Sequence, residues 1–314
     1  MEPIEKMVIA GGGPAGLTAA VYAGRAGIAP LVLEGVAPGG QLAQLEKIDN
    51  YPGFPKGVSG FELAQAMREQ AERFGARFRP GEELAAIEAG PDGALAAVTT
   101  DGGERIAART LVAATGTRPR RLGVPGEDAF SGRGVSYCAT CDGAFFKGRE
   151  VAVAGGGAEA LGAALYLARL CSKVRLVFPE AEPSGAAAAV AAVRANDRIE
   201  TLSGTTVREV LGEGRAMRAL RVANAAGERE ISVAGLFVAL GSGPATDWAG
   251  GLLEFEPDGR LRTRGGATSL PGVFAAGDVC APFLRQVVTA AADGCVAATA
   301  AVRFLNESVR RDAT

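Results

Sequence analysis

The sequence predicts an α/β fold with two Rossmann-like domains, each a doubly wound, three-layer arrangement of a parallel sheet between helices. An apolar strand, a glycine-rich turn and a helix follow one another at residues 7–26, and the same order returns at residues 151–170. The chain has 314 residues, 48% of them hydrophobic, which is enough to bury the cores of two such domains.

The first unit begins with a strand at residues 7–10, followed by Gly11-Gly12-Gly13-Pro14-Ala15-Gly16 and a helix over residues 17–26. Glycines let the backbone approach a pyrophosphate, and the helix N-terminus offers it free N–H groups. A second strand, at residues 29–33, leads to Glu34, where a carboxylate can hold ribose hydroxyls. Strand, turn, helix and acid in this order predict a dinucleotide site.

Two more strands of the same kind are predicted at residues 111–116, ending in a Thr-Gly turn, and at residues 273–278, ending in Gly277-Asp278. An acid at the carboxyl end of a strand suits contact with a polar ligand, although Asp278 could instead cap the next helix. The second unit has strands at residues 151–154 and 174–177, and the alanine-rich residues 185–192 predict a structural helix.

The stretch Cys138-Ala139-Thr140-Cys141 predicts a working dithiol. Two thiols separated by two residues suit a disulfide that opens and closes, and such motifs lower thiol pKa values. The alternative is half of a zinc site, but a structural zinc needs four ligands and the chain has no histidine. The remaining cysteines, Cys171, Cys280 and Cys295, stand alone, so we expect no metal and interpret these three as buried small residues.

Without histidine, acid–base work must be done by carboxylates. Asp142 directly follows the dithiol and is the nearest group able to exchange a proton with a thiolate, a role that requires partial burial to raise its pKa. The alternative is a turn or helix-cap aspartate before Gly143.

Composition excludes several classes of function. The formal charge of −2, without a long basic run, argues against a nucleic-acid partner, and no uncharged apolar run is long enough for a membrane span. The charged start at residues 1–6 lacks a signal-peptide core, and an odd number of cysteines with one close pair suits the cytoplasm.

These motifs together resemble those of the low-molecular-weight thioredoxin reductases over nearly the whole chain. The matching segments are residues 11–16, 39–42, 50–53, 114–116, 134–136, 138–143, 271–278 and 285–286. The resemblance implies FAD as the cofactor and a catalytic set of Cys138, Cys141 and Asp142. It assigns FAD binding to Gly11, Gly13, Pro14, Ala15, Gly16, Glu34, Gly40, Gln41, Leu42, Asn50, Ala114, Thr115, Gly116, Gly277, Asp278, Arg285, Gln286 and Val287.

The resemblance also implies a domain plan and partners. An FAD-binding domain of residues 1–117 and 246–314 would flank an inserted NAD(P)-type domain, residues 118–245, that carries the dithiol. In that family the dithiol passes electrons from the flavin to thioredoxin or a thioredoxin-like protein, a domain rotation exposes it, and the enzyme is a homodimer. Cys141 would lie nearest the flavin, and which thiol attacks the partner stays open.

The second glycine unit departs from the family pattern. Where the family has small polar and acidic pairs the chain has Ala158, Glu159, Gly162 and Ala163, and Glu159 would repel a pyrophosphate at the helix N-terminus. The family's arginine cluster for the 2′-phosphate of NADPH is replaced by Phe178-Pro179-Glu180-Ala181-Glu182-Pro183-Ser184. Losing two or three charge-assisted hydrogen bonds costs about 3–6 kcal/mol. We therefore expect an atypical member with a degraded NADPH site, and NADH fits poorly because Phe178 takes the position of the ribose-binding acid.

The leading hypothesis is an FAD-dependent thioredoxin-disulfide reductase that takes electrons from ferredoxin or another electron carrier. Three alternatives stay open: an NAD(P)H-dependent thioredoxin reductase with an unusual loop, a flavoprotein dithiol oxidase that passes electrons to oxygen, and a redox-sensing or purely binding flavoprotein.

Overall fold

The structure is a computed structural model that describes residues 4–35, 37–214, 216–280 and 284–312, so that residues 1–3 of the charged N-terminal segment lie outside it. Contacts divide the chain into two compact units. Unit 1 is Met1–Arg118 with Pro244–Thr314, and unit 2 is Pro119–Gly243, whereas the sequence placed the domain boundaries after residues 117 and 245. Each unit contains a five-stranded parallel sheet with helices against it, which confirms the predicted α/β class.

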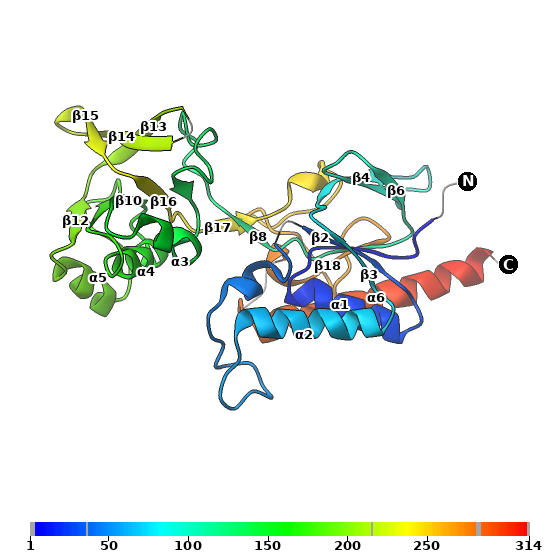
Figure 1. Cartoon of the computed structure of the whole chain (residues 1–314). Coiled ribbons are helices and arrows are strands. Elements are labelled where there is room, and N and C mark those ends of the chain that lie inside the picture. Colours follow the sequence, from blue (N-terminus) through cyan, green and yellow to red (C-terminus); the bar gives the residue numbers. More distant parts are fainter. Residues whose placement is uncertain (1–3, 36, 215, 281–283, 313–314) are drawn as a thin grey trace. The chain divides into compact units, whose positions relative to one another are not determined.

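The sheet of unit 1 has the strand order β18-β7-β1-β2-β3. Its strands are β1 (Val8–Ala10), β2 (Leu31–Gly35), β3 (Arg77–Pro80), β7 (Leu111–Ala113) and β18 (Val273–Ala275). The helices α1 (Pro14–Arg25), α2 (Gly60–Arg73) and α6 (Val287–Asp312) lie along one side of the sheet (Figure 1). The other side carries an antiparallel sheet of β4 (Leu84–Ala89), β5 (Leu95–Thr100) and β6 (Arg105–Ala107).

Unit 1 has two hydrophobic cores, one on each side of its parallel sheet, and successive side chains of β1 point alternately into one and the other. Ile9 packs with residues of α1 and α6, whereas Val8 and Ala10 pack with residues of β4, β5 and β6. All three side chains are buried, because a parallel strand covered on both sides has two apolar faces. The glycine turn that follows β1 is therefore held on a rigid strand.

Helix α6 packs closely on α1. A Cβ atom on Gly294 would lie 2.1 Å from the carbonyl oxygen of Ala15, so this contact admits only glycine. By length and composition alone α6 is apolar enough to cross a membrane. In the structure Ala297, Ala298 and Ala301 of α6 are fully buried, in the same cluster as Ala15 and Ala19 of α1.

The sheet of unit 2 has the order β12-β11-β10-β16-β9, with every strand parallel. Its strands are β9 (Val135–Ser136), β10 (Glu150–Ala154), β11 (Lys173–Val177), β12 (Ile199–Leu202) and β16 (Gly235–Val238). The helices α3 (Ala139–Asp142), α4 (Ala158–Leu167) and α5 (Ala187–Arg194) lie on one side of this sheet (Figure 1). An antiparallel sheet of β13 (Thr206–Glu213), β14 (Ala216–Asn224) and β15 (Gly227–Ser232) packs against the other side of the parallel sheet.

Short elements complete the chain. The strands β8 (Thr117–Pro119) and β17 (Ser242–Pro244) pair where the chain passes from one unit to the other and back. The 3₁₀ helices are η1 (Gly40–Gln44), η2 (Gly143–Phe146), η3 (Asp247–Ala249) and η4 (Gly277–Val279).

Candidate functional site

The predicted dithiol lies in unit 2, at the start of α3, directly after strand β9. A disulfide joins Cys138 and Cys141, whose Cα atoms lie 5.3 Å apart. Cys138 is the N-cap residue of α3, and its sulfur accepts a hydrogen bond from the Cys141 N–H at 3.2 Å. Cys138 is half-buried and Cys141 is exposed, so a partner can reach the pair from solvent.

A serine holds the acid beside the disulfide. The Ser136 hydroxyl donates to Oδ2 of Asp142 at 2.7 Å and accepts the Cys138 N–H at 3.1 Å. Asp142 precedes the 3₁₀ helix η2, but its side chain makes no capping hydrogen bond to that helix. The alternative role of a helix-cap aspartate is therefore not supported at η2. The structure therefore places a half-buried carboxyl group within the same turn as the two sulfurs. The sequence included Ser136 in a matching motif but gave it no role.

The other side of β9 is fixed by a buried network that the sequence did not predict. Tyr137, the residue before Cys138, donates its hydroxyl to Oε1 of Glu127 at 2.8 Å. Glu127 is only 2% exposed and also accepts the N–H groups of Leu122 at 3.0 Å and Gly123 at 2.7 Å. Arg121 donates to the Tyr137 hydroxyl at 3.1 Å. Burial, followed by the bond to Glu127, raises the pKa of Tyr137.

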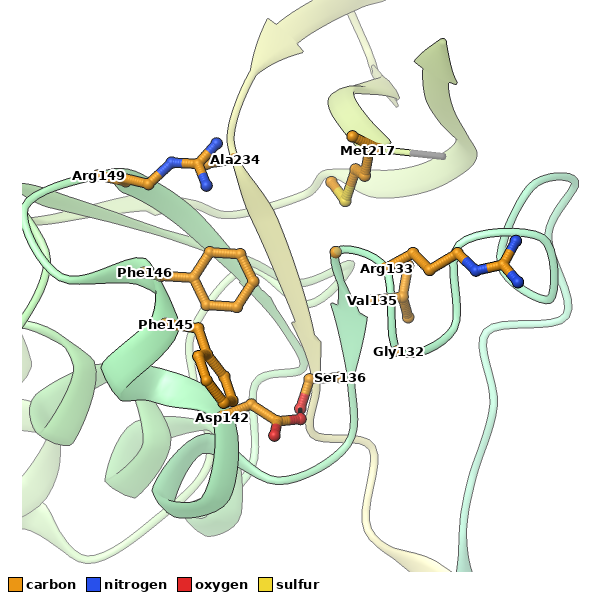
Figure 2. A pocket seen from close by; sticks show the side chains of 12 residues that line it. Gly132, Arg133, Val135, Ser136, Asp142, Phe145, Phe146, Arg149, Met217 and Ala234 are labelled. Atoms are coloured by element: carbon orange, nitrogen blue, oxygen red, sulfur yellow. Dashed lines mark hydrogen bonds between the residues drawn. The ribbon is translucent and has the colours of Figure 1, made fainter. Parts of the chain in front are cut away.

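A cavity of about 290 Å³ opens beside Asp142 within unit 2. Phe145 and Phe146 lie on one side of it, and Val135 and Met217 lie across from them (Figure 2). The lining also includes Gly132, Arg133, Gly134, Ser136, Arg149, Ala216 and Ala234. Phe145 is 78% exposed. An exposed aromatic ring and two arginines around one cavity are typical of a surface that a protein partner covers.

The first glycine turn lies in unit 1, where its glycines have different surroundings. A Cβ on Gly11 would be 2.2 Å from the Ala114 carbonyl oxygen, and a Cβ on Gly16 would be 1.9 Å from the Gly11 carbonyl oxygen. These contacts pack α1 against β7. At Gly13 no atom lies within 4 Å of the added Cβ, so space is open at the helix N-terminus. Pro14 and Ala15 form the first turn of α1, without an acidic residue.

Glu34 lies beside this turn and is buried, and neither oxygen of its carboxylate has a hydrogen-bond partner among the described residues. Burial raises the pKa of the Glu34 carboxyl, and the Arg68 guanidinium opposes the shift. A buried acceptor without donors is costly, so the site is built for a ligand that brings hydroxyl donors.

Other predicted cofactor residues come together from distant parts of the chain. Asn50 donates to the Gln286 side-chain oxygen at 2.8 Å across 236 positions. Arg285 pairs with Asp278, with 2.7 Å between Nε and Oδ2, so Asp278 does not act as a simple helix cap. Both Gln41, at 2.8 Å, and Arg285, at 3.2 Å, donate to the hydroxyl of Thr117. The sequence missed Thr117, because nothing in the local pattern marks it.

Four predicted residues take packing or turn positions. Leu42 is buried with Leu17 and Leu63, and Val287 packs against that cluster. The Thr115 hydroxyl donates to the Ala245 carbonyl at 2.8 Å. Gly40 has a positive φ of 57° and faces Gly13, with 3.4 Å from its Cβ position to the Gly13 Cα. The remaining segment residues lie just after two strands: Ala114 and Gly116 follow β7, and Gly277 begins η4 after β18, with a positive φ at Gly116 and Gly277.

The second glycine turn, in unit 2, is bordered by acidic and apolar groups. Phe178 is 1% exposed and belongs to the core beneath α4. The carboxylate of Glu180 lies 3.0 Å from the Cβ position of Gly156, and the Ser184 N–H donates to the Gly156 carbonyl at 2.7 Å. Glu182 forms an ion pair with Arg194 of α5. This cation was not expected from the sequence, and it is already paired with an acid of the loop.

Of the three cysteines outside the dithiol, two are buried as expected and one, Cys295, is not. Cys171 and Cys280 are buried as expected, and burial raises the pKa of Cys280 to about 12. Cys295 is partly exposed, on α6 near Tyr22. In the ranges that the structure describes, no three metal-ligating side chains gather at one place.

Comparison with known proteins adds the family. Residues 5–294 match the model of a family described as pyridine nucleotide-disulphide oxidoreductase. The chain is 40% identical to a thioredoxin reductase of Mycolicibacterium smegmatis over 309 residues, which cover 98% of each sequence. This chain belongs to that family, among the low-molecular-weight thioredoxin reductases. It is a flavin-dependent disulfide oxidoreductase whose cofactor is FAD.

Solved structures agree. The thioredoxin reductase of Lactococcus lactis in its FR conformation matches with a TM-score of 0.80 and 32% identity, covering 96% of this chain and 99% of that one. A ferredoxin-flavin thioredoxin reductase of Clostridium acetobutylicum matches with a TM-score of 0.53 and 28% identity, covering 96% and 98%.

The residues of unit 1 fit FAD. Open space at Gly13, at the N-terminus of α1, suits a pyrophosphate, and the Glu34 carboxylate, whose oxygens accept no hydrogen bond among the described residues, suits the two hydroxyls of a ribose. When bound, FAD supplies the two-electron chemistry of this family. The chain's own part in that chemistry is a disulfide with a carboxyl group held beside it.

Proposed function

We propose that this enzyme reduces the disulfide of thioredoxin or a thioredoxin-like protein, using electrons from a donor other than NADPH. The proposal assigns FAD to the cradle around Gly13, Glu34 and Asp278, and disulfide exchange to Cys138 and Cys141. The observation that carries the choice of donor is the loop after β11, since residues 178–184 include Glu180 and Glu182 and no cation that could hold a 2′-phosphate.

Three features of unit 2 support this choice. Phe178 directly follows β11 and is 1% exposed, so the position where an acid would hold a coenzyme ribose carries a buried apolar ring instead. Glu180 borders the glycine turn itself. Glu159 lies in the first turn of α4, where the free N–H groups that would hold a pyrophosphate are found. Each feature disfavours NADPH through a different contact.

The reaction at the partner is thiol–disulfide exchange. A Cys138 or Cys141 thiolate attacks one sulfur of the partner disulfide, a mixed disulfide forms, and a partner thiolate leaves. The second thiol of the pair then closes the Cys138–Cys141 disulfide and releases the other partner thiolate. Asp142 is placed to exchange a proton with one of these sulfurs, because Ser136 fixes its carboxyl group in the same turn.

The surface beside the disulfide supports a protein substrate. Phe145 presents an exposed ring next to the cavity, and Arg133 and Arg149 are among the lining residues. Such a surface fits an apolar partner side chain flanked by acidic groups.

Reduced ferredoxin, or another protein electron carrier, is the proposed donor. The match to a ferredoxin-flavin thioredoxin reductase of Clostridium acetobutylicum supports it, since that relative is named for such a donor. The proposed homodimer is supported by α6, on which Val288, Ala292 and Val296 form an exposed uncharged stripe one turn apart.

The deciding experiment is anaerobic stopped-flow reduction of the holoenzyme by NADPH, NADH or reduced ferredoxin, followed by flavin absorbance. We expect ferredoxin to reduce the flavin and both nucleotides to do so far more slowly, even at high concentration and high salt. Rapid reduction at micromolar NADPH would refute the choice of donor. Efficient reduction by NADH alone would refute the proposed protein donor, and Glu180→Ala would then test a ribose contact.

Reverse electron flow is tested with the same protein. A dithiol oxidase would reduce oxygen when supplied with a small dithiol, whereas the proposed reductase would not do so at a comparable rate.

A further inference from the structure

We propose that Arg68 of α2 is a positioning residue for FAD, because it holds the Glu34 carboxylate ionised and ready to accept the hydroxyls of the adenosine ribose. The inference rests on the proposed role of Glu34 and is independent of the electron donor and of the protein substrate.

The geometry singles out Arg68. Its Nε lies 3.5 Å from Oε1 of Glu34 and 3.4 Å from Oε1 of Glu72, one helical turn further on. The first contact gives charge attraction without a hydrogen bond, since Glu34 Oε1 and Arg68 Nε both lack hydrogen-bond partners among the described residues. The guanidinium lies over the ring of Phe78, 4.7 Å from its centroid. Stacking on Phe78 therefore fixes the cation beside the carboxylate but leaves both carboxylate oxygens free.

Among the described residues around Glu34, Arg68 is the cation that interacts with its carboxylate. From α2 it is faced by Arg68 and Glu72, and Glu72 raises the pKa of the Glu34 carboxyl. On β3, Arg79 is committed to Glu82 and Glu104. In the turn after β3, Glu83 borders Gly35, the residue after Glu34. The first turn of α1 contributes no acid.

The ionised state matters for the hydroxyls of a ribose. An ionised carboxylate can accept from both of them, one on each oxygen. A protonated carboxyl has one oxygen that donates instead, so one of the two bonds is lost. Burial favours that neutral form, and Arg68 opposes it. Arg68, acting through Glu34, would in this way set how long the cofactor stays bound.

The test measures FAD release from the holoenzyme by the rise of flavin fluorescence after dilution. Arg68→Met keeps the length of the side chain and removes its charge, whereas Arg68→Lys keeps a cation. The matched control is Arg73→Met, which removes an exposed arginine on the same helix that stacks on Phe74 at 5.0 Å. We expect release from Arg68→Met to be about 10- to 100-fold faster at neutral pH, with partial rescue in Arg68→Lys and little change in Arg73→Met.

The pH dependence of FAD release separates an electrostatic role of Arg68 from a purely structural one, which would leave that dependence unchanged. Because the Glu34 pKa is raised, FAD release from the wild type accelerates as the pH falls through it. Removing Arg68 raises that pKa further, so in Arg68→Met the acceleration sets in at a higher pH. In a Glu34→Gln background, Arg68→Met should add little, since no charge remains to stabilise.

Two results would overturn the proposal. One is release from Arg68→Met at the rate and pH dependence of Arg73→Met. The other is an equally large effect of Arg68→Met in the Glu34→Gln background. If Glu34→Gln alone leaves FAD release unchanged, the assigned role of Glu34 fails first, and the proposal fails with it.

Discussion

Tyr137→Phe removes one hydroxyl from the network that holds the dithiol strand, and its cost can be worked out from the contacts. Glu127 accepts three hydrogen bonds, from two backbone N–H groups and from the Tyr137 hydroxyl. A hydrogen bond to a charged group contributes about 1.5–3 kcal/mol. The two backbone bonds remain in the variant, so unit 2 should lose about 2 kcal/mol of unfolding free energy.

Native-state hydrogen exchange at neutral pH measures this loss by region. Peptides from residues 119–243 should exchange faster by roughly 30-fold, as about 2 kcal/mol implies, whereas peptides of unit 1 should not change. Tyr166→Phe is the control in the same unit, because no hydrogen bond of its hydroxyl occurs among the described residues. A loss below about 0.5 kcal/mol in Tyr137→Phe would refute the energetic reasoning.

The sign of the pH effect follows from the raised pKa of Tyr137. Between the unfolded pKa, near 10, and the higher folded value, the folded state holds more protons than the unfolded state. Stability therefore falls as the pH rises through this window. The deficit of Tyr137→Phe should shrink above about pH 10, as measured by urea unfolding.

The remaining predictions concern the disulfide and the dimer. Cys138→Ser and Cys141→Ser should each abolish thioredoxin reduction and leave FAD bound; near-normal turnover in either variant would contradict the exchange mechanism. Asp142→Asn should slow turnover but leave the disulfide reducible by a chemical dithiol, and Ser136→Ala should slow it less, because the carboxyl group is still present although it loses the hydrogen bond that fixes it; equal losses in stopped-flow traces would argue against a proton-transfer role. Val296→Arg should shift sedimentation from dimer to monomer without release of FAD, and an intact dimer would exclude the α6 stripe as its interface.

The sequence predicted the elements whose signals are local. Both strand-turn-helix units were found, although α1 and α4 begin at Pro14 and Ala158, three residues before the predicted starts. The helices start earlier because the turn residues already adopt helical conformation at the N-terminus, where proline is well tolerated. The antiparallel sheets were missed because their strands give weak patterns: in β15 only Ile231 is buried.

The site was predictable as a set of motifs but not as a set of contacts. Glycine runs, the paired cysteines and Glu34 are visible because each motif is contiguous. The bond between Asn50 and Gln286 spans 236 positions, and Thr117 becomes a partner of Gln41 only once β8 is in place. Burial of Glu127 is equally invisible, since a glutamate in a polar loop ordinarily faces solvent.

The contact of Gly294 with Ala15 has a consequence for the order in which the protein is made. Unit 2 is one continuous stretch, so all its strands are available when residue 243 has been synthesised. The helix that follows the first glycine turn, α1, contacts α2 early but gains its larger packing partner only when α6 has been made. At about 5–20 residues per second, synthesis of the chain from Arg118 to Val287 takes roughly 8–34 s, during which the N-terminal part of unit 1 lacks α6. We therefore expect unit 2 to be able to fold first, whereas the unit 1 segment that contains Asp278, Arg285 and Gln286 is made only afterwards.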